Sequence, residues 1–515
     1  MSAGPVPSPR ERGLSLREPG AIVVVSCYEL GRQPGALAGA VGALEAAGFA
    51  PRAIDVSLQK LDAATLQAAR LVAISVPMHT ALRLGTKVAA RVREGNPQAQ
   101  VVFFGLYAAL NRAHLLEAHA DAVVGDVIAP LVRLAQALDG HAETQDGQAQ
   151  TQDGQAQTQA QAGHSARGWL SSLGAIEGVS TRAHLDEAPP RSEAFPTQRR
   201  GLLPLKRYGT MEWKGESRLV AASEGTRGCK HLCRHCPIVP VWKGRFVAVP
   251  VDGVMADLAQ QIDAGARHVS FADPDFLNGP THALRLARAL HARWPEVTFD
   301  ATIKVEHLLK HADVLPELAR SGGLFVISAV ESLNDRVLLA LDKGHVAADV
   351  ARAARVVRAA GMELKPTLMP FTPWTTLADL PALFDFAEAN ELVENIEPVQ
   401  YTLRLLLPPG SAVVANEPGA PWLRELVPGD FGHRWVHEDA RVDALQKAMA
   451  QLASRHAHEG VDDADTFEAL RALVDEAVQG RPHARVQRAR REVPRLSEPW
   501  FCCAEPTEGQ LKIAE

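Results

Sequence analysis

Three cysteines lie close together near the middle of the chain, in the stretch EGTRGCKHLCRHCP. Cys229, Cys233 and Cys236 have the spacing C-x3-C-x2-C on a glycine-flanked loop. Three thiolates on a tight loop suit a cubane iron–sulfur cluster and leave one iron without a protein ligand. A structural zinc site completed by His231 or His235 is the alternative, because three cysteines and one histidine form an ordinary zinc ligand set.

The elements around this loop indicate a barrel. The loop follows a predicted strand at residues 218–222, so it lies at the carboxyl end of that strand. Further strands are predicted at 269–272, 298–302, 324–328, 363–369 and 396–405, with helices such as 346–360 between them. Repeated βα units predict a full or partial TIM-like barrel whose functional residues lie at the carboxyl ends of its strands.

The motif and its βα context resemble the radical SAM superfamily, and His235 fills the aromatic position that the family has before its third cysteine. The resemblance implies a [4Fe–4S] cluster on Cys229, Cys233 and Cys236, whose open iron binds the amino and carboxylate groups of S-adenosylmethionine. It also implies cleavage of that molecule to methionine and a 5′-deoxyadenosyl radical, which abstracts hydrogen from a substrate that the sequence does not identify.

Two downstream segments extend the resemblance. Asp273 lies in the segment SFADPDF, which closes the second predicted barrel strand, and the family places polar groups there against the methionine end of the cofactor. A carboxylate can bind the ammonium group at that end. Ser328 and Glu331 belong to the segment SAVES, where the family has a glutamate that hydrogen-bonds the adenosine ribose. The resemblance therefore implies that Asp273, Ser328 and Glu331 bind the cofactor.

The amino-terminal part shows a second α/β pattern. Residues 21–140 contain predicted strands at 21–25, 52–56, 71–76, 100–105 and 122–124, with helices at 34–48, 80–93 and 111–118. Short apolar strands that alternate with helices predict a doubly wound, flavodoxin-like domain with a parallel sheet covered on both faces.

Such a domain before a radical SAM barrel resembles the cobalamin-binding radical SAM enzymes. In those with a histidine ligand to cobalt, a D-x-H-x-x-G loop follows the first strand, but the matching loop at residues 27–34 has no histidine. His79, after the third strand, is a candidate substitute. Cobalamin therefore stays an open candidate cofactor, and the alternative is a domain that keeps the fold but binds another molecule or carries the substrate.

The last cysteines form a separate motif, Trp500-Phe501-Cys502-Cys503-Ala504-Glu505-Pro506. It resembles the tail of the CUAEP/CCAEP-tail radical SAM proteins, in some of which selenocysteine replaces the second cysteine. A position that accepts selenium suggests a strongly nucleophilic chalcogen. We expect Cys502 and Cys503 to be catalytic, with Cys503 as nucleophile, reductant or hydrogen donor. The alternative is a tail with incidental thiols.

The remaining segments complete the predicted organisation. The repeat TQDGQAQ at residues 144–150 and 151–157 has no apolar seam and predicts a flexible linker. The expected parts are a disordered start (1–20), a cobalamin-binding-like domain (21–140), a linker and lead-in (141–222), the barrel (223–410), a helical region (411–496) and the tail (497–515).

Composition limits the class of protein. The 515 residues are 46% hydrophobic and 22% charged, with a net charge of −6, which is typical of a globular protein and gives no electrostatic reason to expect nucleic acid as a partner. No apolar run is long enough to span a membrane. The polar start predicts no secretory signal, so we expect a cytoplasmic enzyme.

The expected partners are a small-molecule or peptide substrate and a reductant such as flavodoxin or ferredoxin. Cobalamin-dependent methyl transfer and sulfur or selenium chemistry are the candidate outcomes of the radical reaction. The competing interpretation is a non-catalytic iron–sulfur or zinc protein that senses or passes electrons.

Overall fold

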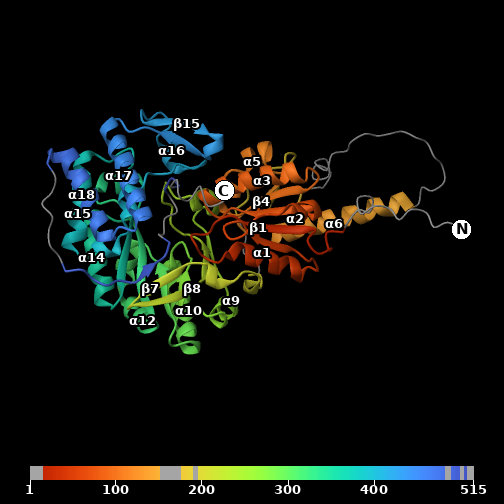
Figure 1. Ribbon diagram of the computed structural model, residues 1–515, viewed down its shortest axis with the longest axis horizontal. Helices are drawn as coiled ribbons and strands as arrows, with labels where there is room; N and C mark the ends of the chain where they lie inside the picture. Colours follow the sequence, from red (N-terminus) through yellow and green to blue (C-terminus); the bar gives the residue numbers. More distant parts are fainter. Residues whose placement is uncertain (1–14, 151–174, 190–194, 482–488, 499–503, 507–515) are drawn as a thin grey trace. The chain divides into compact units, whose positions relative to one another are not determined.

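The computed structural model describes residues 15–150, 175–189, 195–481, 489–498 and 504–506, with only the backbone described over 141–150. The chain forms two compact units (Figure 1). The first runs to Leu202 without residues Leu30–Gln33, and the second contains those four residues and the chain from Leu203 to Lys512.

The first unit is built on a six-stranded sheet in the order β2-β1-β3-β4-β5-β6. Its strands are β1 (Ile22–Ser26), β2 (Arg52–Asp55), β3 (Leu71–Ser75), β4 (Gln100–Phe104), β5 (Ala122–Val124) and β6 (Val179–Ser180). The first five are parallel, and β6 joins antiparallel to β5. All residues of β1, β3 and β4 are buried, which explains their continuous apolar sequences.

Six helices accompany these strands: α1 (Gly35–Ala46), α2 (Ala63–Ala68), α3 (His79–Gly95), α4 (Leu106–Leu110), α5 (Arg112–Ala118) and α6 (Ala129–Gln150). The strand order places a topological switch point between β1 and β3. The chain continues from β1 to β2 on one side of this point and from β3 to β4 on the other. The predicted doubly wound, flavodoxin-like fold is therefore confirmed.

The boundary predicted at residue 140 is too early. Helix α6 continues to Gln150 and includes the first copy of the seven-residue repeat. Its first turns bury Leu131, Leu134 and Leu138, and a helix anchored in this way extends cooperatively into a following Ala- and Gln-containing segment. The second copy of the repeat lies outside the described residues.

The second unit contains a seven-stranded sheet in the order β14-β13-β12-β11-β8-β7-β17. Five adjacent strands, from the edge strand β14 to β8, are parallel. They are β8 (Glu216–Ser223), β11 (His268–Phe271), β12 (Thr298–Thr302), β13 (Gly323–Glu331) and β14 (Glu363–Leu368). Strands β7 (Thr210–Trp213) and β17 (Arg495–Leu496) extend the edge in antiparallel fashion. The sheet is a curled half-barrel, so the predicted partial TIM-like barrel is confirmed.

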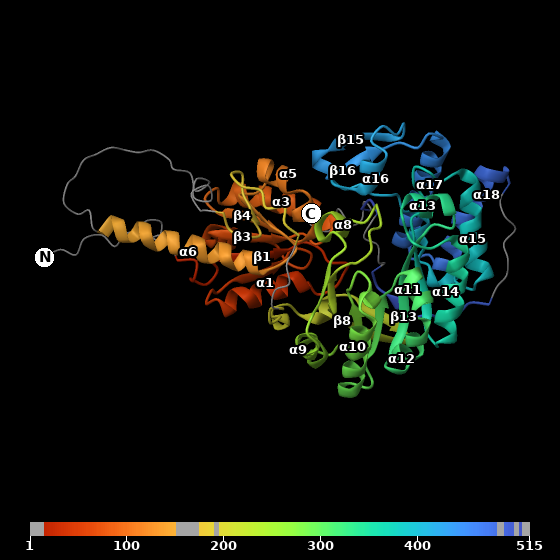
Figure 2. The same cartoon turned by 180° about the vertical axis from the view of Figure 1, so that it is seen from behind.

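Helices cover the outer face of this sheet, as Figure 2 shows for α9, α10, α12 and α14. The helices of the barrel region are α8 (Ile238–Trp242), α9 (Val251–Asp263), α10 (Pro280–Arg293), α11 (Val305–Lys310), α12 (Leu315–Arg320), α13 (Asp335–Ala340), α14 (Ala347–Ala359) and α15 (Leu380–Ala389). Helix α14 falls within the predicted range 346–360.

The strand predicted at residues 396–405 is wrong. Its first part is a 3-10 helix, η8 (Pro398–Thr402), and only isolated bridges follow, one of them between Arg404 and Phe371. Pro398 has no backbone N–H that could donate to a neighbouring strand. The Leu368 amide of β14 instead donates to the Gln400 side-chain oxygen at 3.0 Å.

The region from 411 to 496 is only partly helical. Helices α16 (Ala412–Asn416), α17 (Ala440–Glu459) and α18 (Asp463–Gln479) are present as expected. Between α16 and α17, however, β15 (Leu423–Val427) and β16 (Gly432–Trp435) form an antiparallel pair.

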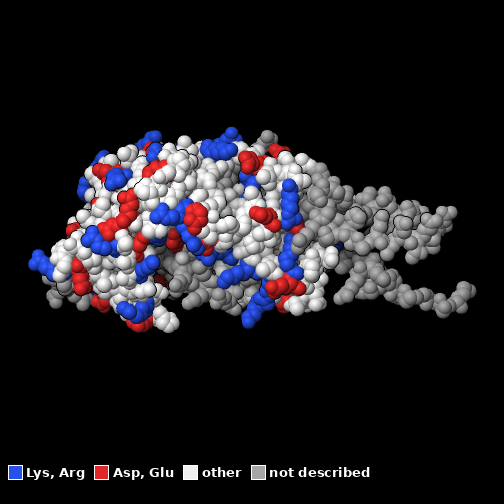
Figure 3. All heavy atoms as spheres, turned by 90° about the horizontal axis from the view of Figure 1, so that it is seen from above, with Lys and Arg blue, Asp and Glu red and all other residues white. Residues whose placement is uncertain are grey.

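Two further features concern the charged surface and the helices. Figure 3 shows basic and acidic side chains interspersed on the visible face rather than gathered by sign. Within the part of the chain that the structure describes, no helix combines the length and apolar character needed to cross a membrane.

Candidate functional site

The three-cysteine loop lies beyond the carboxyl end of β8, between β9 (Thr226–Gly228) and α8. Strand β9 pairs with β10 (Phe246–Ala248), which holds the start of the loop. Gly228 has a φ of +76°, and a Cβ there would lie 2.5 Å from the carbonyl oxygen of Arg245. A glycine is therefore required directly before Cys229.

Backbone hydrogen bonds fix the rest of the loop. The Arg234 amide donates to the carbonyl oxygen of Leu341 at 2.9 Å, and the Arg234 carbonyl accepts from the Val413 amide at 3.3 Å. The Cys236 amide donates to the Cys233 carbonyl at 3.1 Å. The loop is therefore held from several elements before any cofactor binds.

The three thiols are reduced and close enough to influence one another. Burial raises the pKa of the Cys229 thiol to about 12, and the neighbouring Cys236 and Cys233 thiols also raise it. Burial likewise raises the pKa of Cys233. A thiolate is the form that binds metal, and a bound cation favours that form. Their number, type and proximity fit a cubane cluster with three protein ligands.

Glu331 ends β13 in a strained conformation beside this loop. Its φ is +66°, which is unusual for a non-glycine residue and is found where the surroundings impose it. Its carboxylate accepts from Lys343 Nζ at 3.0 Å and lies 3.3 Å from His235 Nε2. Burial opposes ionisation, but Lys343 and His235 outweigh it and lower the pKa of Glu331 to about 2. The residue is ionised and paired within the protein.

Asp273 lies at the carboxyl end of β11 and contacts the lead-in to the cysteine loop. Its two oxygens accept from the Gly225 amide at 2.8 Å and the Thr226 hydroxyl at 2.6 Å. Burial raises its pKa to about 7 despite these hydrogen bonds. The predicted contact of Asp273 with the cofactor ammonium stays a prediction.

Ser328 lies within β13 and is fully buried. Among the described residues, its hydroxyl has no hydrogen-bond partner. A buried hydroxyl without a partner is uncommon in native proteins. The predicted role of Ser328 in cofactor binding stays a prediction.

Sequence reasoning missed a second group next to the cysteines. His231 Nε2 lies 3.3 Å from Asp275 Oδ2, and His307 Nδ1 lies 2.7 Å from the same oxygen. Lys304 Nζ lies 3.2 Å from His231 Nδ1. The residues come from the cysteine loop, the end of β11 and α11, so no local spacing could reveal the group.

A polar network lies lower in the half-barrel. Asp300 Oδ2 accepts from the Ser270 hydroxyl at 2.5 Å and lies 3.0 Å from His268 Nε2. Ser270 also lines a small pocket, together with Val220 and the segments 30–32, 209–210 and 496–498.

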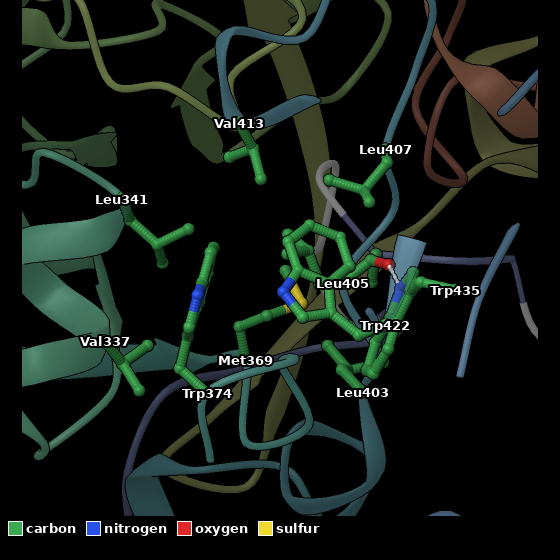
Figure 4. Close-up of a cluster of buried hydrophobic side chains, with 11 residues drawn as sticks. Val337, Leu341, Met369, Trp374, Leu403, Leu405, Leu407, Val413, Trp422 and Trp435 are labelled. Carbon is green, nitrogen blue, oxygen red and sulfur yellow. Dashed lines mark hydrogen bonds between the residues drawn. The ribbon is translucent and has the colours of Figure 1, made fainter. Parts of the chain in front are cut away.

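Of the tail motif, the structure describes the last three residues, Ala504, Glu505 and Pro506. Cys502 and Cys503 lie outside the described residues, but Ala504 forms an antiparallel bridge with Leu405, and the Glu505 amide donates to the Arg404 carbonyl at 3.0 Å. Ala504 is buried in an apolar cluster that contains Trp374 and the other residues labelled in Figure 4. Arg404 also forms a bridge with Phe371, which follows β14, so the tail is anchored at this end of the half-barrel.

Two residues of the first unit lie near the carboxyl ends of its strands. Cys27 is fully buried and burial raises its pKa, as is typical of a small core residue. His79 begins α3, is 3% exposed, and packs edge-on against the Tyr107 ring at 5.8 Å between centroids.

The half-barrel is similar to proteins of a known superfamily. Residues 223–387 match the family model of the Radical SAM superfamily. A tRNA-2-methylthio-N(6)-dimethylallyladenosine synthase of Shewanella sp. (strain W3-18-1) is 27% identical over 199 residues, which are 36% of this chain and 39% of that protein. The same enzyme of Photobacterium profundum is 23% identical over 246 residues, or 45% and 47% of the two chains. This chain therefore spans less than half the length of these two curated relatives.

Solved structures match more of the chain. TsrM, a radical S-adenosylmethionine methyltransferase from Kitasatospora setae solved with cobalamin and a [4Fe–4S] cluster, has a TM-score of 0.59 at 14% identity, covering 89% of this chain and 99% of that one. OxsB, a cobalamin-dependent S-adenosylmethionine radical enzyme, has a TM-score of 0.62 at 13% identity, with 86% and 67% covered. At these identities the likeness concerns the fold.

Proposed function

We propose that this chain, whose residues 223–387 form a radical SAM domain, is an enzyme that cleaves S-adenosylmethionine reductively at a [4Fe–4S] cluster. The observation that carries the proposal is the loop of Cys229, Cys233 and Cys236, in which three mutually influencing thiols lie beyond the carboxyl end of a half-barrel strand. When bound, such a cluster supplies one electron that cleaves S-adenosylmethionine into methionine and a 5′-deoxyadenosyl radical.

The residues of the chain hold and shield this centre. Asp273 fixes the start of the cysteine loop through Gly225 and Thr226, and Glu331 fixes His235 next to the third cysteine. The half-barrel excludes water and positions the substrate carbon, which raises the rate by proximity. The substrate is a small molecule or peptide, and a flavodoxin- or ferredoxin-like reductant in the cytoplasm supplies the electrons.

Cobalamin is the second proposed cofactor, and it belongs to the first unit. Ser26 and Ser75 face each other in register at the carboxyl ends of β1 and β3, on either side of the topological switch. Both hydroxyls are buried and have no hydrogen-bond partner among the described residues. Flavodoxin-like sheets bind their ligands at this switch point. If cobalamin binds there, methyl transfer becomes the favoured outcome, as the name of the structural neighbour TsrM also suggests.

We also propose that Cys502 and Cys503 act in the reaction, with Cys503 as nucleophile, reductant or hydrogen donor. The support is the adjacent Ala504, which is anchored to Leu405 in the second unit. We expect Cys503→Ser to abolish product formation from the natural substrate while the absorbance of the cluster stays unchanged. Full activity of this variant would contradict the proposed chemical role of Cys503.

The test of the main proposal is anaerobic turnover. The reconstituted protein is reduced with dithionite, S-adenosylmethionine is added, and 5′-deoxyadenosine is quantified beside the Cys233→Ala variant. We expect 5′-deoxyadenosine from the wild type and only the enzyme-free background from the variant. Equal amounts from both proteins, or none from a wild type with an intact cluster, would contradict the proposal.

The competing function is a non-catalytic iron–sulfur or zinc protein. Metal analysis of the same sample identifies a zinc protein, because that protein is colourless and contains one zinc ion per chain. A non-catalytic iron–sulfur protein has the cluster absorbance but leaves S-adenosylmethionine intact. Either result would replace the proposed enzyme by a redox or binding protein.

A further inference from the structure

His231, Asp275 and His307 form a compact set of donor atoms that neither the cluster nor its proposed chemistry uses. Their three facing atoms, two imidazole nitrogens and one carboxylate oxygen, all lie within 4.8 Å of one another. The oxygen is 3.3 Å from His231 Nε2 and 2.7 Å from His307 Nδ1. Ligands about 2.1 Å from a common ion lie roughly 3 Å apart, so small side-chain rotations suffice to enclose one.

Burial makes the arrangement costly without a bound ion. Asp275 and His307 are almost completely buried and His231 is largely so. Yet His231 Nε2, Asp275 Oδ2 and His307 Nδ1 are all without a hydrogen-bond partner of acceptable direction among the described residues. The three atoms contact one another, but with poorly aligned partners. Burying polar atoms in this way is unfavourable, and three that meet at one point are uncommon.

We propose that His231, Asp275 and His307 bind a divalent transition-metal ion, zinc or ferrous iron, at a site separate from the cluster. Two imidazoles and one carboxylate are a ligand set that both ions favour, and they leave coordination positions open. The three donors come from the cysteine loop, the end of β11 and α11. An ion here would join these three elements.

Lys304 and Glu306, which lie next to His231, can orient its ring both without and with a bound ion. In the empty state, Lys304 Nζ donates to His231 Nδ1 at 3.2 Å, which places the remaining ring proton on Nε2, toward Asp275. When an ion takes Nε2, the proton belongs on Nδ1, and Glu306 Oε2 lies 3.7 Å from that atom to receive it. Lys304 then keeps Glu306 as its partner at 3.2 Å. Carboxylates behind metal-bound histidines are common in this way.

The ion would act on the cluster loop without touching the thiolates. His231 lies two residues from Cys229 and two from Cys233 in the sequence. Fixing its ring to Asp275 and His307 therefore fixes the loop between two cluster ligands. We infer that the ion is a clamp that keeps the loop in its cluster-binding conformation, and this goes beyond the proposed function.

Cobalt(II) binding tests the site apart from the cluster. The untagged full-length chain with Cys229, Cys233 and Cys236 replaced by alanine is titrated with Co²⁺, and visible absorption is recorded. We expect one Co²⁺ per chain, with d–d bands but no thiolate charge-transfer band, and displacement by Zn²⁺. Adding His307→Gln or Asp275→Asn should weaken binding by at least the ~10-fold typical of lost support at metal sites.

The matched control is His311→Gln. The His311 ring packs against the His307 ring at 5.4 Å but supplies none of the three donor atoms, so affinity should stay unchanged. Equal affinity in the parent and in both ligand variants, or a thiolate charge-transfer band, would overturn the proposal. In that case the residues would form only a hydrogen-bond relay.

A second measurement uses the cluster-containing protein, so that the test does not depend on the folding of the variant without the three cysteines. In the reconstituted wild type, elemental analysis should find one more zinc or iron ion per chain than in Asp275→Asn at equal cluster absorbance. The element that is lost identifies the ion. Equal metal content in both proteins would overturn the proposal, whereas the 5′-deoxyadenosine assay of the wild type would still decide the proposed function by itself.

Discussion

At the scale of single residues, Glu331 and Asp273 show how surroundings set the charge of two buried carboxylates. Lys343 and His235 keep Glu331 ionised, while burial favours the protonated form of Asp273. Both positions were predicted from their segments. Their partners could not be, because Lys343 and Thr226 approach through the fold rather than through the local sequence. The same reason explains why His307 was missed.

Asp273 should give the protein a pH-dependent stability. Its pKa is about 7 in the folded chain against an ordinary value of 3.8, so the folded state binds a proton more tightly than the unfolded state. This stabilisation is fully present below about pH 4 and is lost as the pH rises through about 7. We expect Asp273→Asn to flatten the free energy of unfolding over this range, as measured by urea titration.

The exposed Asp263 on α9 serves as the control, because Asp263→Asn should leave the pH profile unchanged. The same slope in Asp273→Asn and the wild type would show that the Asp273 carboxyl does not titrate in this range.

The Lys343–Glu331 pair should show strong coupling. Lys343→Met leaves the Glu331 carboxylate buried with His235 as its remaining ion-pair partner among the described residues, and breaking a buried ion pair from one side costs about 3–5 kcal/mol. We expect the double variant Lys343→Met/Glu331→Gln to recover much of this loss in urea unfolding. Additive losses in the double variant would mean that the pair contributes no mutual stabilisation.

At the scale of elements, apolar runs with βα periodicity predicted the strands well. Residues 298–302 form β12 as expected, and β2 to β5 begin at the predicted residues. The failure at 396–405 has a different origin. There an apolar sequence is buried by the neighbouring Phe384 and Phe467 rings, which pack against Tyr401 in η8, and burial alone does not distinguish a strand from a 3-10 helix.

The anchoring of the tail can be tested at Ala504. Ala504 is buried in the apolar cluster that also contains Leu405, Trp374 and Trp435, so the charged side chain in Ala504→Glu would have to leave this cluster. We expect faster hydrogen exchange at the Glu505 amide and loss of product formation, with unchanged cluster absorbance. The conservative Ala504→Ser should retain anchoring and most activity.

Unchanged exchange at Glu505 in Ala504→Glu would show that the cluster tolerates the charge. Unchanged turnover with a released tail would separate anchoring from the reaction and argue against a role for Cys503.

At the scale of the whole molecule, the sequence predicted two α/β units and their fold classes, and the comparisons agree. The limits between them were less accurate. Residues 175–189 and 195–202 belong to the first unit, and β6 adds to its sheet, whereas the sequence placed them in the linker and lead-in of residues 141–222. A two-residue strand carries too little periodicity to be recognised.

Cobalamin binding is a prediction about the first unit. If the Ser75 hydroxyl meets the ligand, Ser75→Ala should weaken cobalamin binding roughly tenfold, the worth of one hydrogen bond, without lowering the stability of the free protein. Fluorescence quenching by hydroxocobalamin measures the affinity. Thr86→Ala is the control, because that hydroxyl donates within its own helix to Arg83.

Equal affinity in Ser75→Ala and the wild type would place cobalamin elsewhere. No measurable binding by either protein would remove cobalamin, and with it methyl transfer, from the proposed chemistry.

The most direct test of the central claim is magnetic resonance on the reduced, reconstituted protein with S-adenosylmethionine labelled with ¹³C or ¹⁷O in its carboxylate. If Cys229, Cys233 and Cys236 hold a [4Fe–4S] cluster with an open iron, the EPR signal should change on addition, and the labelled carboxylate should show hyperfine coupling to the cluster. An unchanged spectrum without coupling, from a protein containing four irons per chain, would contradict the account.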